Sequence, residues 1–332
     1  MFDSYICIDT GNSGTKIVYS FPGTDKIYSL FMSSALDEVS VERMENKLKQ
    51  SNWLSFPKPE QQAWLGNGAN KVIAVGELAE KFSPLDRRQE PKYENALYKI
   101  LAAIGVIIET NQISKRKKFK VQLGLLLPWN EYKDRERLLN RLEKLSAGYE
   151  FRGQKLRVKI RKQDCICYPE GGGIAMARVR EKGLDWFKQQ RLGVLMLGDR
   201  NWTGLCFDSG QIKSGASPLD GFSFLLDRVI EDSPCLLNRE KLSEAIFKGI
   251  AQAKKNQAHY YPRPQWEELE PIQSLATARD SDLRESEVKD IERAMTMVAR
   301  EWEVKLLNLI QQVFPKPLTE LNVGGGSLPF FA

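Results

Sequence analysis

Apolar runs and polar turns alternate over the first part of the chain. Residues 5–8 form an apolar run, a polar turn with two glycines follows, and a second β-rich run ends at Tyr19. This order predicts a strand, a turn and a strand. Residues 26–32 can add a third antiparallel strand, so the chain is expected to begin as a meander. Residues 37–50 carry few apolar positions among many charges and predict a weak helix or a surface excursion.

Strands and helices alternate through the middle of the chain. Residues 119–127 are a nearly continuous apolar run, as expected of a central strand that is covered on both faces. Apolar residues at helical spacing over 93–110 predict a helix that packs on the sheet. The other elements expected here are an amphipathic helix at 131–145 and strands at 71–75, 149–151, 155–161 and 164–168.

The pattern of the second half repeats that of the first. Residues 192–207 again predict a strand, a turn and a strand, and this second hairpin can be laid over the first with Gly198 on Gly11 and Thr203 on Lys16. The repeat predicts two α/β domains, over 1–164 and 165–332. Further elements are expected as strands at 211–217 and 318–323 and as helices at 219–231, 238–253 and 281–313.

The composition, 42% hydrophobic and 28% charged, is that of a soluble globular protein. No apolar run is long enough to cross a bilayer, and the N-terminus enters a strand without a basic region or cleavage site, so we expect a cytoplasmic protein. The five cysteines lie mostly in apolar runs, which favours reduced core thiols. The single histidine, His259, argues against a His-based metal site or a Ser/His/Asp triad.

The formal net charge of +6 is mild for 332 residues. Its basic residues concentrate at 115–118 and 152–162, and such runs are usually solvated edges. Direct nucleic-acid binding is therefore not expected. We expect these basic runs to bind an acidic patch on a protein partner instead.

The tip of the first hairpin carries residues suited to phosphate and magnesium. Gly11 and Gly14 let the backbone bend and bring bare N–H groups close to an anion. Asp9, at the carboxyl end of a buried strand, is placed to hold a hydrated Mg²⁺, and Lys16 would supply a point charge for a phosphate. The residues that complete this cradle are Asn12, Ser13 and Thr15.

The same stretch is equally compatible with an ordinary turn and a solvated lysine, because short glycine-rich motifs arise often by chance.

Glu170 also has two interpretations. It follows the strand predicted at 164–168 and precedes a glycine-rich helix start, where it can orient or deprotonate an attacking water as a general base. The alternative is a carboxylate that stabilises the N-terminus of the helix.

The second half offers further candidates for the same ligand. Asp199, Asn201 and Thr203 can donate or accept hydrogen bonds at the turn of the second hairpin. Lys241 and Glu244, on one side of the helix at 238–253, are candidates to line a ribose. A glycine triplet after the last strand permits close backbone approach to a flat ligand, although it can equally be a plain loop; its residues are Gly324, Gly325 and Gly326.

Taken in order, these motifs resemble those of the actin-like ATPases. The pattern Asp9-x-Gly11-x-x-x-x-Lys16 is similar to the first phosphate motif of the family, and the order of elements is most similar to the plasmid-segregating ParM/StbA type. A Glu in a Pro-Glu context at Glu170 matches as well, and the family uses the glycine triplet on the adenine side. The family's second motif has an Asp two residues before the glycine, where this chain has Met196.

The resemblance implies an actin-like fold of two ribonuclease-H-like domains with a nucleotide in the cleft between them. It implies ATP or GTP with Mg²⁺ as cofactors and Asp9, Glu170 and Asp199 as catalytic residues, Asp199 acting from a shifted position because of Met196. The implied function is nucleotide-dependent assembly into homopolymeric filaments, for plasmid or DNA segregation or cell organisation, with an adaptor protein joining the filament to its cargo. The family also has a closing helix after the glycine triplet, where only residues 328–332 remain here.

Two other classes of function stay open at this stage. Met196 favours a nucleotide-gated adaptor or scaffold that hydrolyses poorly. A small-molecule kinase of the same superfold would need a second pocket and a catalytic Asp, and the second hairpin lacks an Asp at the expected place.

Overall fold

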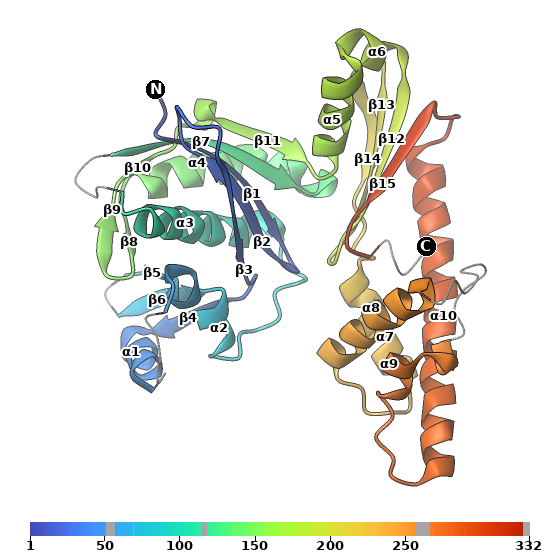
Figure 1. The fold of residues 1–332 in the computed structure, drawn as a ribbon. Coiled ribbons are helices and arrows are strands. Elements are labelled where there is room, and N and C mark those ends of the chain that lie inside the picture. Colours follow the sequence, from blue (N-terminus) through green and yellow to red (C-terminus); the bar gives the residue numbers. More distant parts are fainter. Residues whose placement is uncertain (51–56, 69, 114–117, 256–265, 328–332) are drawn as a thin grey trace. The chain divides into compact units, whose positions relative to one another are not determined.

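The computed structural model describes residues 1–50, 57–68, 70–113, 118–255 and 266–327. The chain divides into two compact units, Met1–Glu170 and Gly171–Ala332, and each has its own hydrophobic core (Figure 1). The division falls just after the predicted boundary at 164/165, because the strand that follows residue 164 pairs with the sheet of the first unit. His259, residues 328–332 and most of the basic run at 115–118 lie outside the described residues.

The main sheet of the first unit is built around its N-terminal strand. Strand β1 (Ser4–Gly11) pairs antiparallel with β2 (Gly14–Ser20) and parallel with β7 (Phe119–Leu127). Strand β3 (Ile27–Met32) pairs antiparallel with β2. The meander and the central strand predicted from the sequence are therefore confirmed.

Two short strands complete this sheet on the other edge of β7. Strand β10 (Val158–Lys159) pairs parallel with the start of β7, and β11 (Cys165–Pro169) pairs parallel with its end. Since β1 also runs parallel to β7, the carboxyl ends of β1, β7 and β11 share one edge of the sheet.

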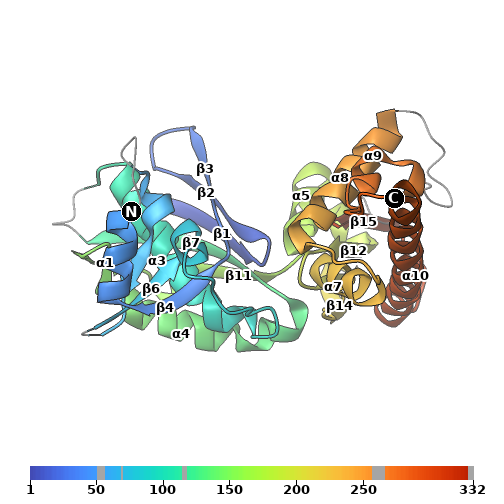
Figure 2. The same cartoon turned by 90° about the horizontal axis from the view of Figure 1, so that it is seen from below.

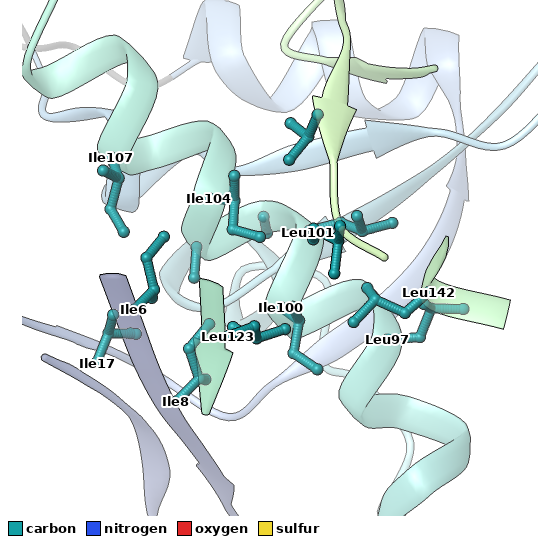
Figure 3. Packing of buried hydrophobic residues seen from close by; sticks show 14 of the residues in the cluster. Ile6, Ile8, Ile17, Leu97, Ile100, Leu101, Ile104, Ile107, Leu123 and Leu142 are labelled. Atoms are coloured by element: carbon teal, nitrogen blue, oxygen red, sulfur yellow. The ribbon is translucent and has the colours of Figure 1, made fainter. Parts of the chain in front are cut away.

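Helix α3 (Lys92–Thr110) packs on one face of the sheet, and α4 (Arg135–Ser146) lies beside it. Aliphatic side chains of α3 recur at helical spacing and meet the inward side chains of the strands, each burial contributing about 1.5–3 kcal/mol. Figure 3 shows this core, which includes Ile6, Ile8, Ile17, Leu97, Ile100, Leu101, Ile104, Ile107, Leu123 and Leu142.

A second sheet of the first unit has the strand order β4-β6-β5-β8-β9. Its strands and the two helices near it are β4 (Leu36–Ser40), α1 (Val41–Gln50), β5 (Trp64–Gly66), β6 (Lys71–Val75), α2 (Glu77–Glu80), β8 (Tyr149–Phe151) and β9 (Gln154–Leu156).

Two predictions in this region are wrong in part. The weak helix expected over 37–50 begins only at Val41, because β4 pairs with β6 and the ladder outweighs the helical preference of a charged segment. The single strand expected over 155–161 is divided, since β9 belongs to the second sheet and β10 to the first.

The second unit repeats the arrangement around β1. Strand β12 (Arg191–Leu197) pairs antiparallel with β13 (Trp202–Asp208), which pairs antiparallel with β14 (Gln211–Ala216). Strand β15 (Glu320–Gly324) lies parallel to β12, as β7 lies parallel to β1. The internal repeat expected from the sequence is thus present as a hairpin, a third antiparallel strand and a parallel neighbour.

Helices flank this second sheet. The longest, α10 (Ser281–Val313), has the predicted bounds, and α7, α8 and α9 gather beside it (Figure 2). The other helices of the unit are α5 (Gly172–Lys182), α6 (Leu184–Gln189), α7 (Phe222–Asp232), α8 (Arg239–Lys255) and α9 (Glu270–Gln273).

The cysteines are free thiols, but only Cys206 is buried, whereas Cys7 is exposed and the others are half-buried. The expectation of core thiols therefore holds for Cys206 alone. Among the described helices, none has both the length and the apolar character that a bilayer crossing demands.

Candidate functional site

The first hairpin places its predicted site residues on two different faces. Its register pairs Asp9 with Lys16 and Gly11 with Gly14, which leaves Asn12 and Ser13 as the two-residue turn. Alternation along the strands puts Asp9 and Lys16 on the same face of the hairpin.

Thr15 lies on the opposite, inward face of β2, where its side chain is buried. Its hydroxyl has no hydrogen-bond partner among the described residues. Thr15 can therefore offer only its backbone to a ligand on the face of Asp9. Asn12, another residue of the predicted phosphate cradle, already accepts a hydrogen bond from Ser34 at its carbonyl.

Gly11 keeps space open beside the Asp9 carboxylate. A Cβ atom on Gly11 would lie 3.7 and 3.8 Å from the two carboxylate oxygens of Asp9 and 3.3 Å from the carbonyl oxygen of Gly14. A Cβ atom alone would be in ordinary contact with the carboxylate, but a longer side chain at residue 11 would start beside it and could occupy the adjoining space. The glycine thus leaves room for a ligand next to Asp9.

Glu170 lies at the same sheet edge as Asp9. Its backbone N–H donates to the carbonyl of Leu127, the last residue of β7, at 2.8 Å. Asp9 lies near the end of β1 on the other side of β7, so one strand separates the two carboxylates, a backbone spacing of about 10 Å. Strand order alone therefore brings together two acidic residues that are far apart in the sequence.

Lys92, the first residue of α3, joins the two carboxylates. Its Nζ lies 2.7 Å from Oδ1 of Asp9 and 2.7 Å from Oε1 of Glu170. The Lys92 side chain is only 7% exposed, whereas Asp9 and Glu170 remain 31% and 20% exposed. The ammonium is therefore enclosed while both carboxylates keep access to solvent.

Electrostatics keep Asp9 and Lys92 ionised. Burial alone would raise the pKa of Asp9, but the charge and hydrogen bond of Lys92 outweigh it, with help from Lys16 and Lys99, and lower that pKa. Burial alone would lower the pKa of Lys92, but the carboxylates of Glu170 and Asp9 raise it well above its usual range. Asp9 and Lys92 are thus an ion pair, and Lys92 makes its second contact to Glu170.

Sequence reasoning missed Lys92, although one feature of the sequence could have pointed to it. A lysine in the first turn of a helix faces the positive end of the macrodipole and is disfavoured there. Lys92 directly follows Pro91 at the start of α3, so an acidic partner outside the helix would offset this unfavourable placement.

The second hairpin uses its predicted polar side chains internally. Nδ2 of Asn201 donates to Oγ1 of Thr203 at 3.1 Å, and Thr203 shares a hydrogen bond of 2.7 Å with Ser217. Asn201 and Thr203 are both buried. The backbone N–H of Gly198 donates to the carbonyl of Asn201 at 3.1 Å. Asn201 and Thr203 therefore organise the turn, and Asp199, which is half-buried, is more accessible than either of them.

Helix α7 is bonded to the same turn by its first amides. The N–H of Phe222 donates to the carbonyl of Gly198, and the N–H of Ser223 donates to that of Asp199. Asp220, just before α7, accepts hydrogen bonds from Nε1 of Trp302 at 2.7 Å and from Nζ of Lys305 at 2.8 Å, both on α10. The hairpin tip, α7 and α10 are therefore joined by a continuous set of hydrogen bonds.

The glycine triplet docks on the second hairpin. Gly324 is the register partner of Met196, and a Cβ atom on Gly324 would lie 3.3 Å from the sulfur of Met196. Ser327 is buried, and its hydroxyl donates to the carbonyl of Leu197 at 2.7 Å. Met196 thus packs against the start of the triplet at the position where the resembling family has an Asp.

Lys241 and Glu244 lie on the exposed side of α8. Glu244 forms an ion pair with Lys248 at 2.6 Å, and both side chains are more than half exposed. Their role at a ribose stays a prediction.

The donor set near Asp9 suits a magnesium ion that keeps most of its waters, because such an ion takes one or two carboxylates from the protein. Asp9 is partly exposed, and the missing side chain of Gly11 leaves room beside it. No group of three or more His, Cys, Asp or Glu side chains poised for a metal occurs in the described part of the chain. Asp9 would thus hold the ion largely through water.

Comparison with solved structures identifies the architecture. The actin-like protein Alp7A superposes with a TM-score of 0.62 at 17% identity, over 98% of this chain and 84% of Alp7A. This chain has the actin-like fold. The actin-like fold is also shared with ParM of Bacillus thuringiensis solved with AMPPNP, with a TM-score of 0.52 at 12% identity over 97% of this chain and 87% of ParM. A filament structure of Alp12 gives a TM-score of 0.51 at 16% identity over 98% of this chain and 88% of Alp12.

Comparison of the sequence alone finds no family model and no curated protein that matches this chain.

Proposed function

We propose that this chain is an actin-like ATPase of the ParM/StbA type that assembles into filaments when it binds ATP or GTP with Mg²⁺. The observation that carries the proposal is the meeting of Asp9 and Glu170 at one edge of the main sheet. Lys16 lies on the same face of the hairpin as Asp9. The likeness to a ParM solved with AMPPNP and to Alp12 solved as a filament supports a nucleotide and self-assembly.

Each residue of the first unit has a distinct role in this proposal. Asp9 holds the hydrated ion, Gly11 leaves space beside that carboxylate, and Lys16 offers a point charge to a phosphate. Glu170 orients the attacking water and accepts its proton as a general base. Mg²⁺, when bound, neutralises phosphate charge. Met1–Glu170 and Gly171–Ala332 then correspond to domains I and II of an actin-like protein.

The proposed partners are further copies of this chain and an adaptor protein that links the filament to DNA or another cargo. Nucleotide binding changes the population of subunit conformations and so the affinity of one copy for the next. Hydrolysis then weakens the assembly. Direct nucleic-acid binding is not part of the proposal, and the cytoplasmic location stays a prediction.

A sedimentation assay with phosphate release measured on the same sample tests this function. ATP with Mg²⁺ should send the protein to the pellet and release phosphate. AMPPNP should give assemblies at least as stable, because assembly requires binding and not hydrolysis. A protein that binds both nucleotides but stays in the supernatant with each would contradict filament assembly.

A poorly hydrolysing, nucleotide-gated adaptor is the second candidate, and Met196 favours it. A methionine in β12, the first strand of the second hairpin, cannot orient a metal-bound water. This function predicts nucleotide binding without phosphate release and without pelleting. A small-molecule kinase, in contrast, would release little phosphate alone and would transfer it to an added hydroxyl compound.

A further inference from the structure

We propose that Lys92 is a positioning residue that balances the charge of Asp9 and Glu170, so that this sheet edge can accept a polyanionic nucleotide. The inference rests on the proposed function and adds to it a residue that the motifs of the sequence do not contain. Lys92 acts through the two carboxylates and is not itself placed against a phosphate.

The geometry of the triad is the first argument. One ammonium group makes two contacts of 2.7 Å to carboxylates that come from strands on opposite sides of β7. An ammonium has three N–H donors, so two of them are committed to Asp9 and Glu170. With its side chain 7% exposed, Lys92 lies behind the two acidic groups and not in front of them.

Charge is the second argument. Asp9, Glu170 and Lys92 together carry a net charge of −1, from two carboxylates and one ammonium. Without Lys92 the same carboxylates would carry −2, beside the place where a triphosphate with several negative charges has to bind. Charges near a protein surface interact over several ångströms with an effective dielectric constant of about 20. The additional negative charge would therefore repel the triphosphate and weaken its binding.

The burial of Lys92 is the third argument. A buried ion pair is weak support for stability, because an apolar side chain of similar size often serves as well. The start of α3 also disfavours a cation through the helix dipole. A methionine would fill the same space without either cost, so packing alone does not require a charge at residue 92.

Binding of AMPPNP with Mg²⁺, measured by calorimetry, tests the inference without depending on turnover. Lys92→Met should raise Kd roughly 10- to 100-fold. Lys92→Met/Glu170→Gln returns the net charge to −1 and should restore Kd to within about threefold of the wild type. A direct phosphate contact or a purely structural role would leave the double variant as weak as Lys92→Met, and that result would overturn the inference.

Arg152→Met is the matched control for the loss of an ion pair. Arg152, which follows β8, pairs at 2.7 Å with Glu109 of α3. Glu109 is 17 residues from Lys92, about 25 Å along the helix. This variant should bind AMPPNP like the wild type, and a weakening equal to that of Lys92→Met would overturn the inference by showing that any lost ion pair on α3 has this effect.

Glu170→Gln keeps the test decisive if Lys92→Met does not fold. This variant removes one negative charge while Lys92 remains, so it should bind AMPPNP at least as tightly as the wild type, and weaker binding would overturn the charge-balance inference. A wild-type chain that binds no nucleotide would overturn the proposed function as well. Wild-type binding with an unchanged Kd in a folded Lys92→Met variant would overturn only the role of Lys92.

Discussion

Gly325 approaches Leu197 so closely that a Cβ atom on Gly325 would lie 2.2 Å from the carbonyl oxygen of Leu197. Gly325 also has a φ of +115°, which side chains with a Cβ rarely adopt. The atoms in the way belong to the backbone of β12, so no rotamer change can relieve the contact. The middle glycine of the triplet is therefore required by the second hairpin itself.

Gly325→Ala should destabilise the second unit by about 2 kcal/mol or more, because the substitution combines an unfavourable φ with a backbone clash. For a unit of this size the expected fall in Tm is roughly 4–8 °C. Gly326→Ala is the matched control, since a Cβ atom there would meet no atom within 4 Å. Equal melting temperatures for the two variants would refute the docking contact, whereas weaker nucleotide binding by Gly326→Ala alone would support the adenine-side role of the triplet.

Asp9→Ala should abolish Mg²⁺-dependent phosphate release, because it removes the carboxylate that would hold the ion. Asp3→Ala is the control, because Asp3 lies just before β1, at the end of the strand away from the hairpin turn, and accepts a hydrogen bond from the N–H of Lys120. That control should lose about 1 kcal/mol of stability and keep its turnover. Turnover of the Asp9 variant at the wild-type rate would remove Asp9 from the proposed site.

Glu170→Ala separates the two readings of this residue. A general base predicts nearly normal ATP binding, long-lived filaments and a hydrolysis rate reduced roughly 10²- to 10⁴-fold. A helix-start carboxylate predicts a loss of about 0.3–1 kcal/mol of stability and normal turnover per folded molecule. A melting curve and a phosphate-release rate from one preparation decide between them, and unchanged turnover would leave Asp199 as the acidic candidate for placing the water.

The acid stability of the second unit should depend on Glu320. Nε and Nη2 of Arg178 donate to its two carboxylate oxygens at 2.6 and 2.9 Å. These hydrogen bonds, followed by one from Asn322, lower the pKa of Glu320 to about 2. A lowered folded-state pKa stabilises the fold above the unfolded pKa, so this contribution should be lost as the pH falls from about 4.3 towards 2.

Urea unfolding between pH 5 and pH 2.5 measures that loss, and Glu320→Gln should flatten the pH dependence while costing about 1 kcal/mol at pH 7. An identical pH profile for the variant and the wild type would show that the pair is not linked to folding.

The sequence was sufficient to predict elements whose apolar pattern is long and regular. The central strand at 119–127 and the helix at 281–313 have the predicted bounds, because burial and periodicity coincide there. The segment at 37–40 was less tractable, since a short charged strand is stabilised by its partner β6 and not by its own pattern. Local composition cannot reveal such a partner.

The site divides in the same way. Asp9 and Glu170 were identifiable because each follows a predicted strand, and parallel strands bring their ends to one edge. Lys92 was missed because its partners are 83 and 78 residues away in the sequence. The internal use of Asn201 and Thr203 was also hidden, because Ser217, which completes their hydrogen-bond chain, belongs to another segment.

The hydrogen bonds that join the second hairpin to α7 and α10 also have a mechanical consequence. From Trp302, which is bonded to Asp220, α10 extends back 21 residues to Ser281, a distance of about 30 Å. A rigid rod of that length is a lever, and a tilt of about 5° at Trp302 displaces its far end by about 3 Å. A small tilt of α10 at Trp302 would thus become a displacement of several ångströms at the N-terminal end of the helix.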